Sequence, residues 1–277
     1  MKKKDQITTI ALIAVLVIGL SLLLYPTVSN WWNKRVSSYA VSSYMSHVGV
    51  IDNEEYDRML EEARIYNESL VGRYNEYALT GSQRARYDDI LNISDGIMAY
   101  IEIPAIQVEL PIYHGTSEPV LQIAVGHLDW TSFPVGGEST HCALSGHRGL
   151  PSARLFTDLD KLVLGDIFVL HVLDEKFTYE VDQIKIVEPH ESEDLTIQEG
   201  KDLVTLVTCT PYGVNSHRLL VRGHRVENLA ETVNVRVTAD AMIIEKLIVA
   251  PFLLIPVLLV FLLIIAIPNK KNRRNEK

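Results

Sequence analysis

The sequence predicts a mainly β domain, a closed barrel or a sandwich, carried between two membrane-spanning helices. Two long uncharged apolar runs lie near the ends of the 277-residue chain, and short runs rich in β-branched and aromatic residues follow one another in residues 96–227. Many short strands with few helical signals are typical of barrels and sandwiches. The composition agrees, because 47% apolar and 22% charged residues with two cysteines exclude a disordered chain and a disulfide-rich miniprotein.

The first apolar run predicts an uncleaved membrane anchor. Residues 7–25 carry no charge, and at about 1.5 Å per helical residue they nearly cross a hydrocarbon layer of roughly 30 Å. A signal peptide is the alternative, but no small-residue cleavage site follows cleanly, and Trp31 and Trp32 stand where interfacial aromatics belong. We therefore assign residues 1–33 to a basic tip and an N-terminal transmembrane anchor.

The second apolar run, Leu247 to Pro268, predicts another span and fixes the orientation of both. Lysines 2, 3 and 4 precede the first run, and five cations follow the second between residues 270 and 277. The positive-inside rule then puts both termini in the cytoplasm and the central domain on the extracellular face. Residues 228–246 would form a juxtamembrane linker, and residues 247–277 a C-terminal transmembrane helix with a basic tail.

The segment between the anchors is acidic. Without the eight cations and two acids at the ends of the chain, 18 Lys and Arg face 33 Asp and Glu, a net charge of −15. Such a surface repels phosphate backbones. We therefore expect no nucleic-acid partner.

Residues 34–95 predict an extracytoplasmic helical segment. Between Asp52 and Leu70 apolar side chains recur at the i, i+3, i+4, i+7 spacing of an amphipathic helix, and Asp52 with Glu55 resembles a capping pair. A polar stretch from Tyr77 to Asp89 follows, and the strand pattern begins near Ile97. A domain boundary is expected near residue 95, with the β domain in residues 96–227.

Six runs in this second part predict strands, and residues 118–125 and 153–159 give brief helical signals. Around Phe177, Tyr179 and Val181 apolar and polar residues alternate, as in a sheet with one buried face. The six runs are Met98–Ile103, Val108–Tyr113, Ile167–Leu173, Phe177–Val187, Leu203–Thr208 and Leu219–Val226.

Cys209 is the candidate nucleophile. It ends an apolar strand in TLVTCTPYG, where rigid backbone holds the thiol beside a loop. Acyl transfer also needs a proton shuttle and an oxyanion donor, and His147 in ALSGHRGLPSA and Arg218 in the strand RLLVRG can supply them. Other residues compete for these two roles, namely Arg222 and the histidines His114, His141, His217 and His224.

Three other interpretations of the cysteines stay open on composition and spacing alone. Cys209 could be a small buried hydrophobe, or it could form a disulfide with Cys142, as cysteines of exported domains often do. His141, Cys142, His147 and Cys209 could also hold a metal, although their spacing matches no usual zinc pattern.

Four strings in order resemble a class C, pilin-polymerising sortase, over roughly residues 96–226. This resemblance implies an eight-stranded β-barrel without cofactor or metal, in which Cys209 is the nucleophile, His147 the proton donor and acceptor, and Arg218 the oxyanion stabiliser. Arg222 is then structural, and Cys142 packs in the core. The strings are GIMAYIEIPAIQVELPIYHGTS, VGHLDWTSFPVGG, LSGHRGLPSARLFTDLDKL and TLVTCTPYGVNSHRLLVRGHR.

The resemblance also implies a reaction and its partners. Cys209 would cleave an LPxTG-like sorting signal between Thr and Gly through a thioacyl enzyme. A lysine amine of the next pilin subunit would resolve the thioacyl enzyme, whereas in housekeeping relatives the amine belongs to the cell-wall precursor. A membrane scaffold without turnover is a further alternative, which the intact set of Cys209, His147 and Arg218 disfavours.

One departure from the family concerns the lid that covers many pilus sortase sites. The usual Asp-Pro-aromatic anchor is missing, because the chain has no proline between Pro26 and Pro104. We therefore expect a lid that is weakly held or open. Tyr77, Arg84 and Tyr87 are the candidate substitutes, and no sequence argument selects one of them.

Overall fold

The computed structural model describes residues 3–72, 79–93 and 96–228. In the described part of the chain, residues up to Ser29 belong to one unit and residues from Asn30 on to another. All strands of the described part lie in the second unit. The predicted second span, and the linker before it beyond residue 228, lie outside the described residues.

The N-terminal apolar run lies in one long helix, α1 (Lys3–Val48). Among the described residues it is the one helix long and apolar enough to cross a membrane, so it fits the expected anchor. From Asn30 on it belongs to the second unit. There Tyr44 is fully buried, donates to the carbonyl oxygen of Met98 (3.2 Å) and accepts from the amide of Leu173 (2.7 Å).

Helix α2 (Asn53–Leu70) confirms the predicted amphipathic helix and its start. Asp52 is the N-cap, and its Oδ1 accepts from the amide of Glu55 at 2.9 Å. Leu60, Ala63 and Leu70 are buried against the barrel.

The polar stretch after α2 contains a helix that the apolar pattern did not predict, α3 (Gly81–Asp89). Its start is stabilised locally, because the amide of Thr80 donates to Oε1 of Gln83 (2.8 Å). Tyr87 is its one buried residue. A helix held by a single buried aromatic leaves almost no periodic signal in the sequence.

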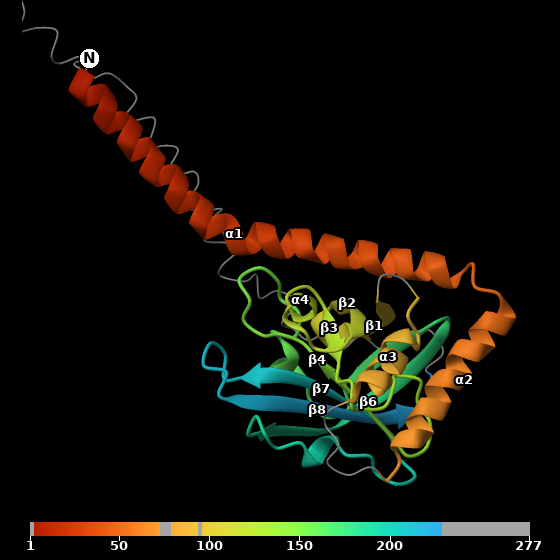
Figure 1. Ribbon diagram of the computed structural model, residues 1–277. Helices are drawn as coiled ribbons and strands as arrows, with labels where there is room; N and C mark the ends of the chain where they lie inside the picture. The colour runs from red at the N-terminus through yellow and green to blue at the C-terminus, as the bar shows by residue number, and fades with distance from the viewer. Residues whose placement is uncertain (1–2, 73–78, 94–95, 229–277) are drawn as a thin grey trace, which may run out of the picture. The chain divides into compact units, whose positions relative to one another are not determined.

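Eight strands close into a barrel in the order β1-β2-β3-β4-β7-β8-β6-β5, which confirms the expected architecture (Figure 1). The pairs β2–β3 and β4–β7 are parallel, and the others are antiparallel. The bounds are β1 Ile97–Ile103, β2 Val108–His114, β3 Val125–His127, β4 Thr140–Ser145, β5 Ile167–Val172, β6 Glu175–Val187, β7 Asp202–Thr210 and β8 His217–Val226.

The six strands named above are all present, and β3 and β4 complete the eight. Strand β3 has three residues, and β4 is buried on both faces over its first five residues, so neither alternates. The first helical signal is a single turn, α4 (Glu118–Leu121). Residues 153–158 form no helix, residues 155–158 being turns, and only η2 (Leu159–Lys161) is helical nearby. The amide of Phe156 bonds instead to the carbonyl oxygen of His147.

Strands β4, β7 and β8 form the part of the wall that carries the site. On their inner face Leu144, Leu206 and Val221 occupy directly paired positions and are fully buried. Burying a side chain of this size contributes roughly 1.5–3 kcal/mol. This packing fixes the register of three strands, and register decides which residues share the outer face.

Candidate active site

Cys209 and Arg218 pair directly across the antiparallel β7–β8 ladder, and His147 follows the neighbouring strand β4. The parallel pairing of β4 with β7 aligns Ser145 with Val207, and the amide of Gly146 donates to the carbonyl oxygen of Val207 (3.1 Å). His147 comes directly after Gly146, two residues beyond the end of β4. The three predicted site residues therefore lie at the same end of three neighbouring strands.

Cys209 sits where β7 leaves the barrel wall. It is partly exposed, with a free thiol. Because side chains alternate along a strand, it shares the outer face with Val207 rather than the core with Leu206. A thiol at this place is held by the ladder and open to a substrate.

His147 follows a position that only glycine fits. A Cβ on Gly146 would lie 2.6 Å from the Phe156 ring, so glycine lets the chain pass over that ring. The His147 side chain is partly exposed, and its Nε2 lies 3.6 Å from Oε2 of Glu118 in α4. A hydrogen bond from Gln122, and then the nearby His147, lower the pKa of Glu118. Glu118 is thus a carboxylate that can stabilise a positive imidazolium.

Sequence reasoning missed Glu118 as a neighbour of the site. It precedes His147 by 29 positions, and in the sequence it only begins a helical signal. No local pattern could have found it, because the contact depends on how the barrel brings α4 to the end of β4.

Arg218 and Arg222 differ clearly in their partners. Nη1 of Arg218 donates to the carbonyl oxygens of His217 (3.1 Å) and Asn215 (3.4 Å), within the turn before β8. Arg222 forms a two-point ion pair with Asp182 at 2.9 and 3.0 Å. It lies four residues further along β8, about 13 Å from the position of Arg218. The geometry therefore favours Arg218 as the partner of Cys209.

The competing histidines have partners elsewhere. His141 is fully buried; its Nδ1 donates to the carbonyl oxygen of Thr196 (2.9 Å), and its Nε2 accepts from Thr205 (2.8 Å). Burial lowers the pKa of His141 to about 4. His114 bonds two backbone carbonyl oxygens. The remaining two, His217 and His224, lie near the carboxylates of Glu188 and Asp182, respectively.

The cysteines form no disulfide. Both are free, and Cys142 is buried in the core, where burial raises the pKa of its thiol well above the usual value. Cys142 pairs with Val204, five residues before Cys209, which is about 16 Å along the strand. A disulfide needs Cα atoms within about 7 Å. The same separation rules out the metal site considered above, and among the residues described no other cluster of three metal-binding groups occurs.

An apolar cluster lies on the outer face beside Cys209. Ala143, Val207 and Leu220 supply it from β4, β7 and β8, and Leu195 of η3 (Glu193–Leu195) packs on them from the β6–β7 connection; all four side chains are buried. Leu128 and Trp130, in the loop before β4, pack against this cluster while keeping part of their surface exposed.

Comparisons with known proteins agree with this geometry. The Sortase domain model matches residues 101–226. Sortase D of Bacillus subtilis is 35% identical over 129 residues, 46% of this chain and 62% of that protein. The crystal structure of sortase C1 from Streptococcus agalactiae matches with a TM-score of 0.67 and 51% identity, over 69% of this chain and 100% of that one. The chain belongs to the sortase family, class C.

A second solved relative supports the same class. Sortase C of Streptococcus pneumoniae, described for its catalysis and pilin substrate specificity, matches with a TM-score of 0.63 and 43% identity, over 69% of this chain and 98% of that one. Sortases are cysteine transpeptidases, so the expected enzyme class is confirmed at the level of the family. The match spans about three fifths of the curated Bacillus subtilis relative, 62% of its length.

In this sortase Arg148 links the loop of His147 to the turn after Cys209. Its side chain is only 9% exposed and forms an ion pair with Asp160. Its Nη1 lies 3.5 Å from Oγ1 of Thr210, and its guanidinium lies over the Tyr212 ring, 5.8 Å from the centroid. Arg148 therefore helps to set the spacing between His147 and Cys209.

The N-terminal helices hold the loop that carries Leu128 and Trp130. Asn67 of α2 is buried and bonds Phe133 twice, its Nδ2 donating to the carbonyl oxygen (3.1 Å) and its Oδ1 accepting from the amide (2.7 Å). Tyr87 of α3 donates to Nδ1 of His127 (2.9 Å), whose Nε2 donates to the carbonyl oxygen of Ser132 (2.8 Å). The two helices thus position the loop that carries Leu128 and Trp130.

These contacts bear on the candidate lid residues. Arg84 forms an ion pair with Asp129, and Tyr87 is fully buried against His127. Both side chains are therefore engaged with β3 and the loop that follows it. Tyr77 lies outside the described residues, so the open lid stays a prediction.

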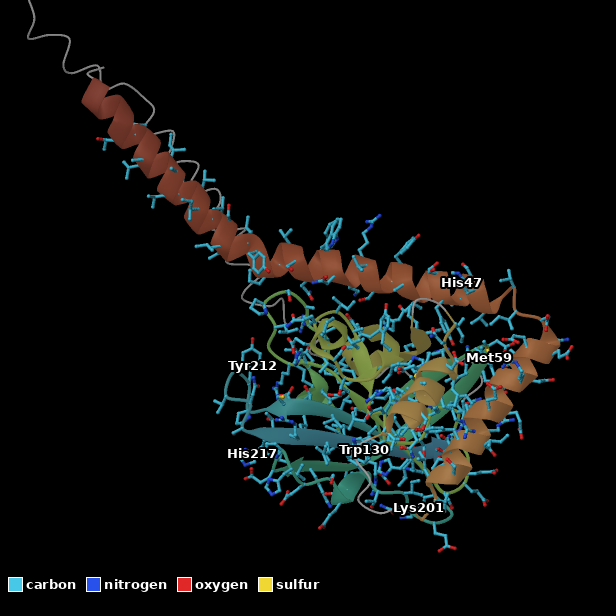
Figure 2. The ribbon with its side chains drawn as sticks, viewed as in Figure 1. His47, Met59, Trp130, Lys201, Tyr212 and His217 are labelled. Atoms are coloured by element: carbon cyan, nitrogen blue, oxygen red, sulfur yellow. The ribbon has the colours of Figure 1, made fainter. Side chains whose placement is uncertain are left out.

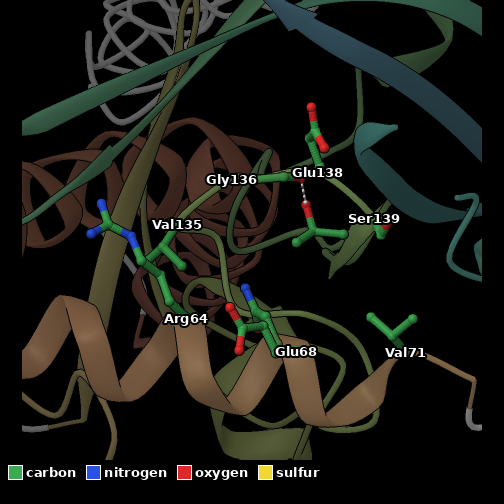
Figure 3. Close-up of a pocket in the computed structure, with 10 residues that line it drawn as sticks. Arg64, Glu68, Val71, Val135, Gly136, Glu138 and Ser139 are labelled. Carbon is green, nitrogen blue, oxygen red and sulfur yellow. Dashed lines mark hydrogen bonds between the residues drawn. The ribbon is translucent and has the colours of Figure 1, made fainter. Parts of the chain in front are cut away.

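A pocket lies at the opposite end of the β4–β7 pair. Its volume is about 430 Å³, and it is lined by Arg64 and Glu68 of α2 and by the loop of residues 135–140 (Figure 3). Its strand residue Thr140 pairs with Asp202, seven residues before Cys209, about 23 Å along β7. Tyr212 follows Cys209 in the sequence, and His217 directly precedes Arg218. Figure 2 shows both at the other end of the barrel from Met59 of α2. This pocket is therefore separate from the candidate active site.

Proposed function

We propose that this sortase cleaves an LPxTG-like sorting signal between Thr and Gly and transfers the acyl group to a lysine amine of a pilin subunit. The observation that carries the proposal is the direct pairing of Cys209 with Arg218 on β7 and β8, with His147 two residues beyond the end of the neighbouring strand β4. In this proposal the enzyme is a two-pass membrane protein with both termini in the cytoplasm. Its barrel then faces the cell surface, where its substrates are assembled.

In the first half-reaction the Cys209 sulfur attacks the carbonyl carbon of the substrate Thr. The carbonyl oxygen becomes an oxyanion, and Arg218 donates to it. Nη1 of Arg218 already bonds its own turn, so Nη2 and Nε are the donors that face the oxyanion. His147 protonates the leaving glycine amine as the C–N bond breaks, and a thioester on Cys209 remains.

In the second half-reaction a lysine amine attacks the thioester carbon. His147 takes the proton of that amine, the C–S bond breaks, and an isopeptide bond forms between the two proteins. Glu118, 3.6 Å from His147, stabilises the imidazolium that exists before the first proton transfer and again after the second. The chain therefore supplies every group that the reaction needs from its own side chains.

The proposal places the first residues of the sorting signal against the exposed side of the apolar cluster. The Leu and Pro side chains of LPxTG are apolar, and Leu128 and Trp130 are the cluster's neighbours that keep part of their surface exposed. In this proposal, binding energy from that contact serves to position the scissile bond at Cys209.

The alternative acceptor is the cell-wall precursor amine, as in an anchoring sortase. Product analysis separates the two acceptors: the full-length enzyme in nanodiscs receives an LPxTG peptide together with a lysine-containing pilin and a cell-wall-type amine. The proposal expects the isopeptide-linked pilin as the main product. Transfer to the cell-wall amine alone would assign the enzyme to anchoring, and binding of the peptide without any cleavage would make it a scaffold.

A further inference from the structure

We infer that the second half of α1, residues 30–48, lies on the outer surface of the membrane and holds the catalytic domain against the lipid. The helix has two contrasting faces. Its inner face packs on the barrel through Ser37, Val41 and Tyr44, all buried, and Asn33 Nδ2 donates to the carbonyl oxygen of Ser152 (2.7 Å).

The outer face of this helix is aromatic and cationic. Trp31, Arg35 and Tyr39 follow one another at i, i+4 and i+8, and Trp32 and Val36 lie beside them on the same side. Tyr39 is 77% exposed, Trp32 61% and Trp31 58%. The guanidinium of Arg35 lies 5.8 Å from the Trp31 ring centroid. No described residue of the barrel covers this face.

The charge of this segment differs from that of the rest of the exterior domain. Residues 6–51 contain no Asp or Glu, whereas all 33 acids of the acidic segment follow Ile51. Within residues 30–48 the formal charges are Lys34 and Arg35, both positive. A helix with Trp and Tyr beside cations on its solvent face is typical of helices that lie in the lipid interface, and it attracts anionic lipids.

Lipid is also the partner that the chain itself brings close. The apolar run of residues 7–25 ends five residues before Asn30, so the membrane surface is within about 8 Å of helix length from the start of this face. Pro26 stands between the two parts and removes one helical hydrogen bond, which permits the axis to bend. A second copy of the chain could cover the same face, but it would not explain the absence of acids.

The consequence for catalysis rests on the proposed function. A domain held flat on the bilayer keeps Cys209 at a fixed height. Substrates that are themselves anchored in the membrane would then approach Cys209 in a restricted orientation, which raises their effective concentration at the site.

The test measures the depth of a probe in the bilayer and needs no enzymatic activity. The full chain carrying Cys209→Ala receives Tyr39→Cys, is labelled with an environment-sensitive fluorophore and is placed in nanodiscs of phosphatidylcholine and phosphatidylglycerol with brominated acyl chains. Cys142 is buried, and the Cys209→Ala parent checks that it takes no label. The matched control is Lys201→Cys, exposed on the side of the barrel away from this helix (Figure 2).

We expect bromine to quench the Tyr39 probe strongly and the Lys201 probe hardly at all. Adding Trp32→Glu is expected to weaken the quenching at Tyr39, whereas Ser69→Glu on the exposed side of α2 leaves it unchanged. Equal quenching at Tyr39 and Lys201 would overturn the inference, and so would a Tyr39 probe shielded only in dimers. Thermal unfolding of each variant checks that the barrel is intact.

Discussion

Cys209 and Arg218 occupy directly opposite positions of the antiparallel β7–β8 ladder. This pairing decides between the two arginines of β8, because Arg222 lies four residues away in a two-point ion pair with Asp182. A residue opposite the nucleophile can reach the developing oxyanion, and one bound to a carboxylate further along the strand cannot. The first prediction follows from this difference.

Arg218→Lys is expected to lower kcat by about 100-fold with little change in KM, because a lysine ammonium cannot reproduce the planar fork of donors at the oxyanion. Peptide cleavage followed by liquid chromatography gives both constants. Arg222→Lys is the matched control, on the same strand and face, and should keep kcat within a few fold. A larger loss in Arg222→Lys than in Arg218→Lys would exchange the two roles.

Arg148→Gln is expected to lower kcat by roughly tenfold, because the change loosens the spacing between His147 and Cys209 by which the reacting groups are aligned. Asp160 is left without its partner but stays 44% exposed, so the free energy of unfolding should fall only modestly. The alkylation rate of Cys209 provides a second readout. An unchanged kcat, with stability reduced, would show that Arg148 has a structural role only.

Asn67→Ala is expected to raise KM for the sorting peptide more than it lowers kcat. The change leaves the buried amide and carbonyl of Phe133 unpaired, at a cost of about 2–4 kcal/mol in the free energy of unfolding, and frees the loop that carries Trp130. Ser69→Ala, on the exposed side of the same helix, is the control. If KM stays constant while urea unfolding shows the expected loss in the free energy of unfolding, the helices stabilise the barrel without affecting peptide binding.

Stability is expected to fall as the pH drops below about 6.5. His141 and His127 are buried and neutral, and desolvation lowers their pKa values to about 4 and about 3. In the unfolded chain both take up a proton near pH 6.5, so each costs up to about 1.4 kcal/mol per pH unit between that pH and its folded pKa. Thermal unfolding from pH 7 to 4 measures the slope. His141→Gln should reduce it, and a flat profile would contradict the assignment of both groups as neutral.

The candidate site residues could be selected from sequence strings, but their alignment could not. Cys209 and Arg218 stand on strands whose apolar pattern is plain, whereas the position of His147 depends on β4. That strand is buried on both faces over most of its length, so it lacks the alternation that identifies a strand with one buried face. Its parallel register with β7 is a tertiary property.

The supporting residues could not be predicted for a related reason. Glu118 and Asn67 act through contacts with residues 29 and 66 positions away, His147 and Phe133. Helix α3 has one buried residue and is held by that packing and a local capping bond. Such features follow from the closed barrel, and the sequence pattern around each residue contains no sign of them.

The most direct test of the central claim is the intact mass of the full-length chain after incubation with an LPxTG peptide. The account predicts a thioester adduct on Cys209 containing the peptide up to its Thr. This adduct should be absent in Cys209→Ala and strongly reduced in His147→Ala. An adduct that persists in Cys209→Ala, or none at all on wild-type enzyme whose Cys209 titrates as a free thiol, would contradict it.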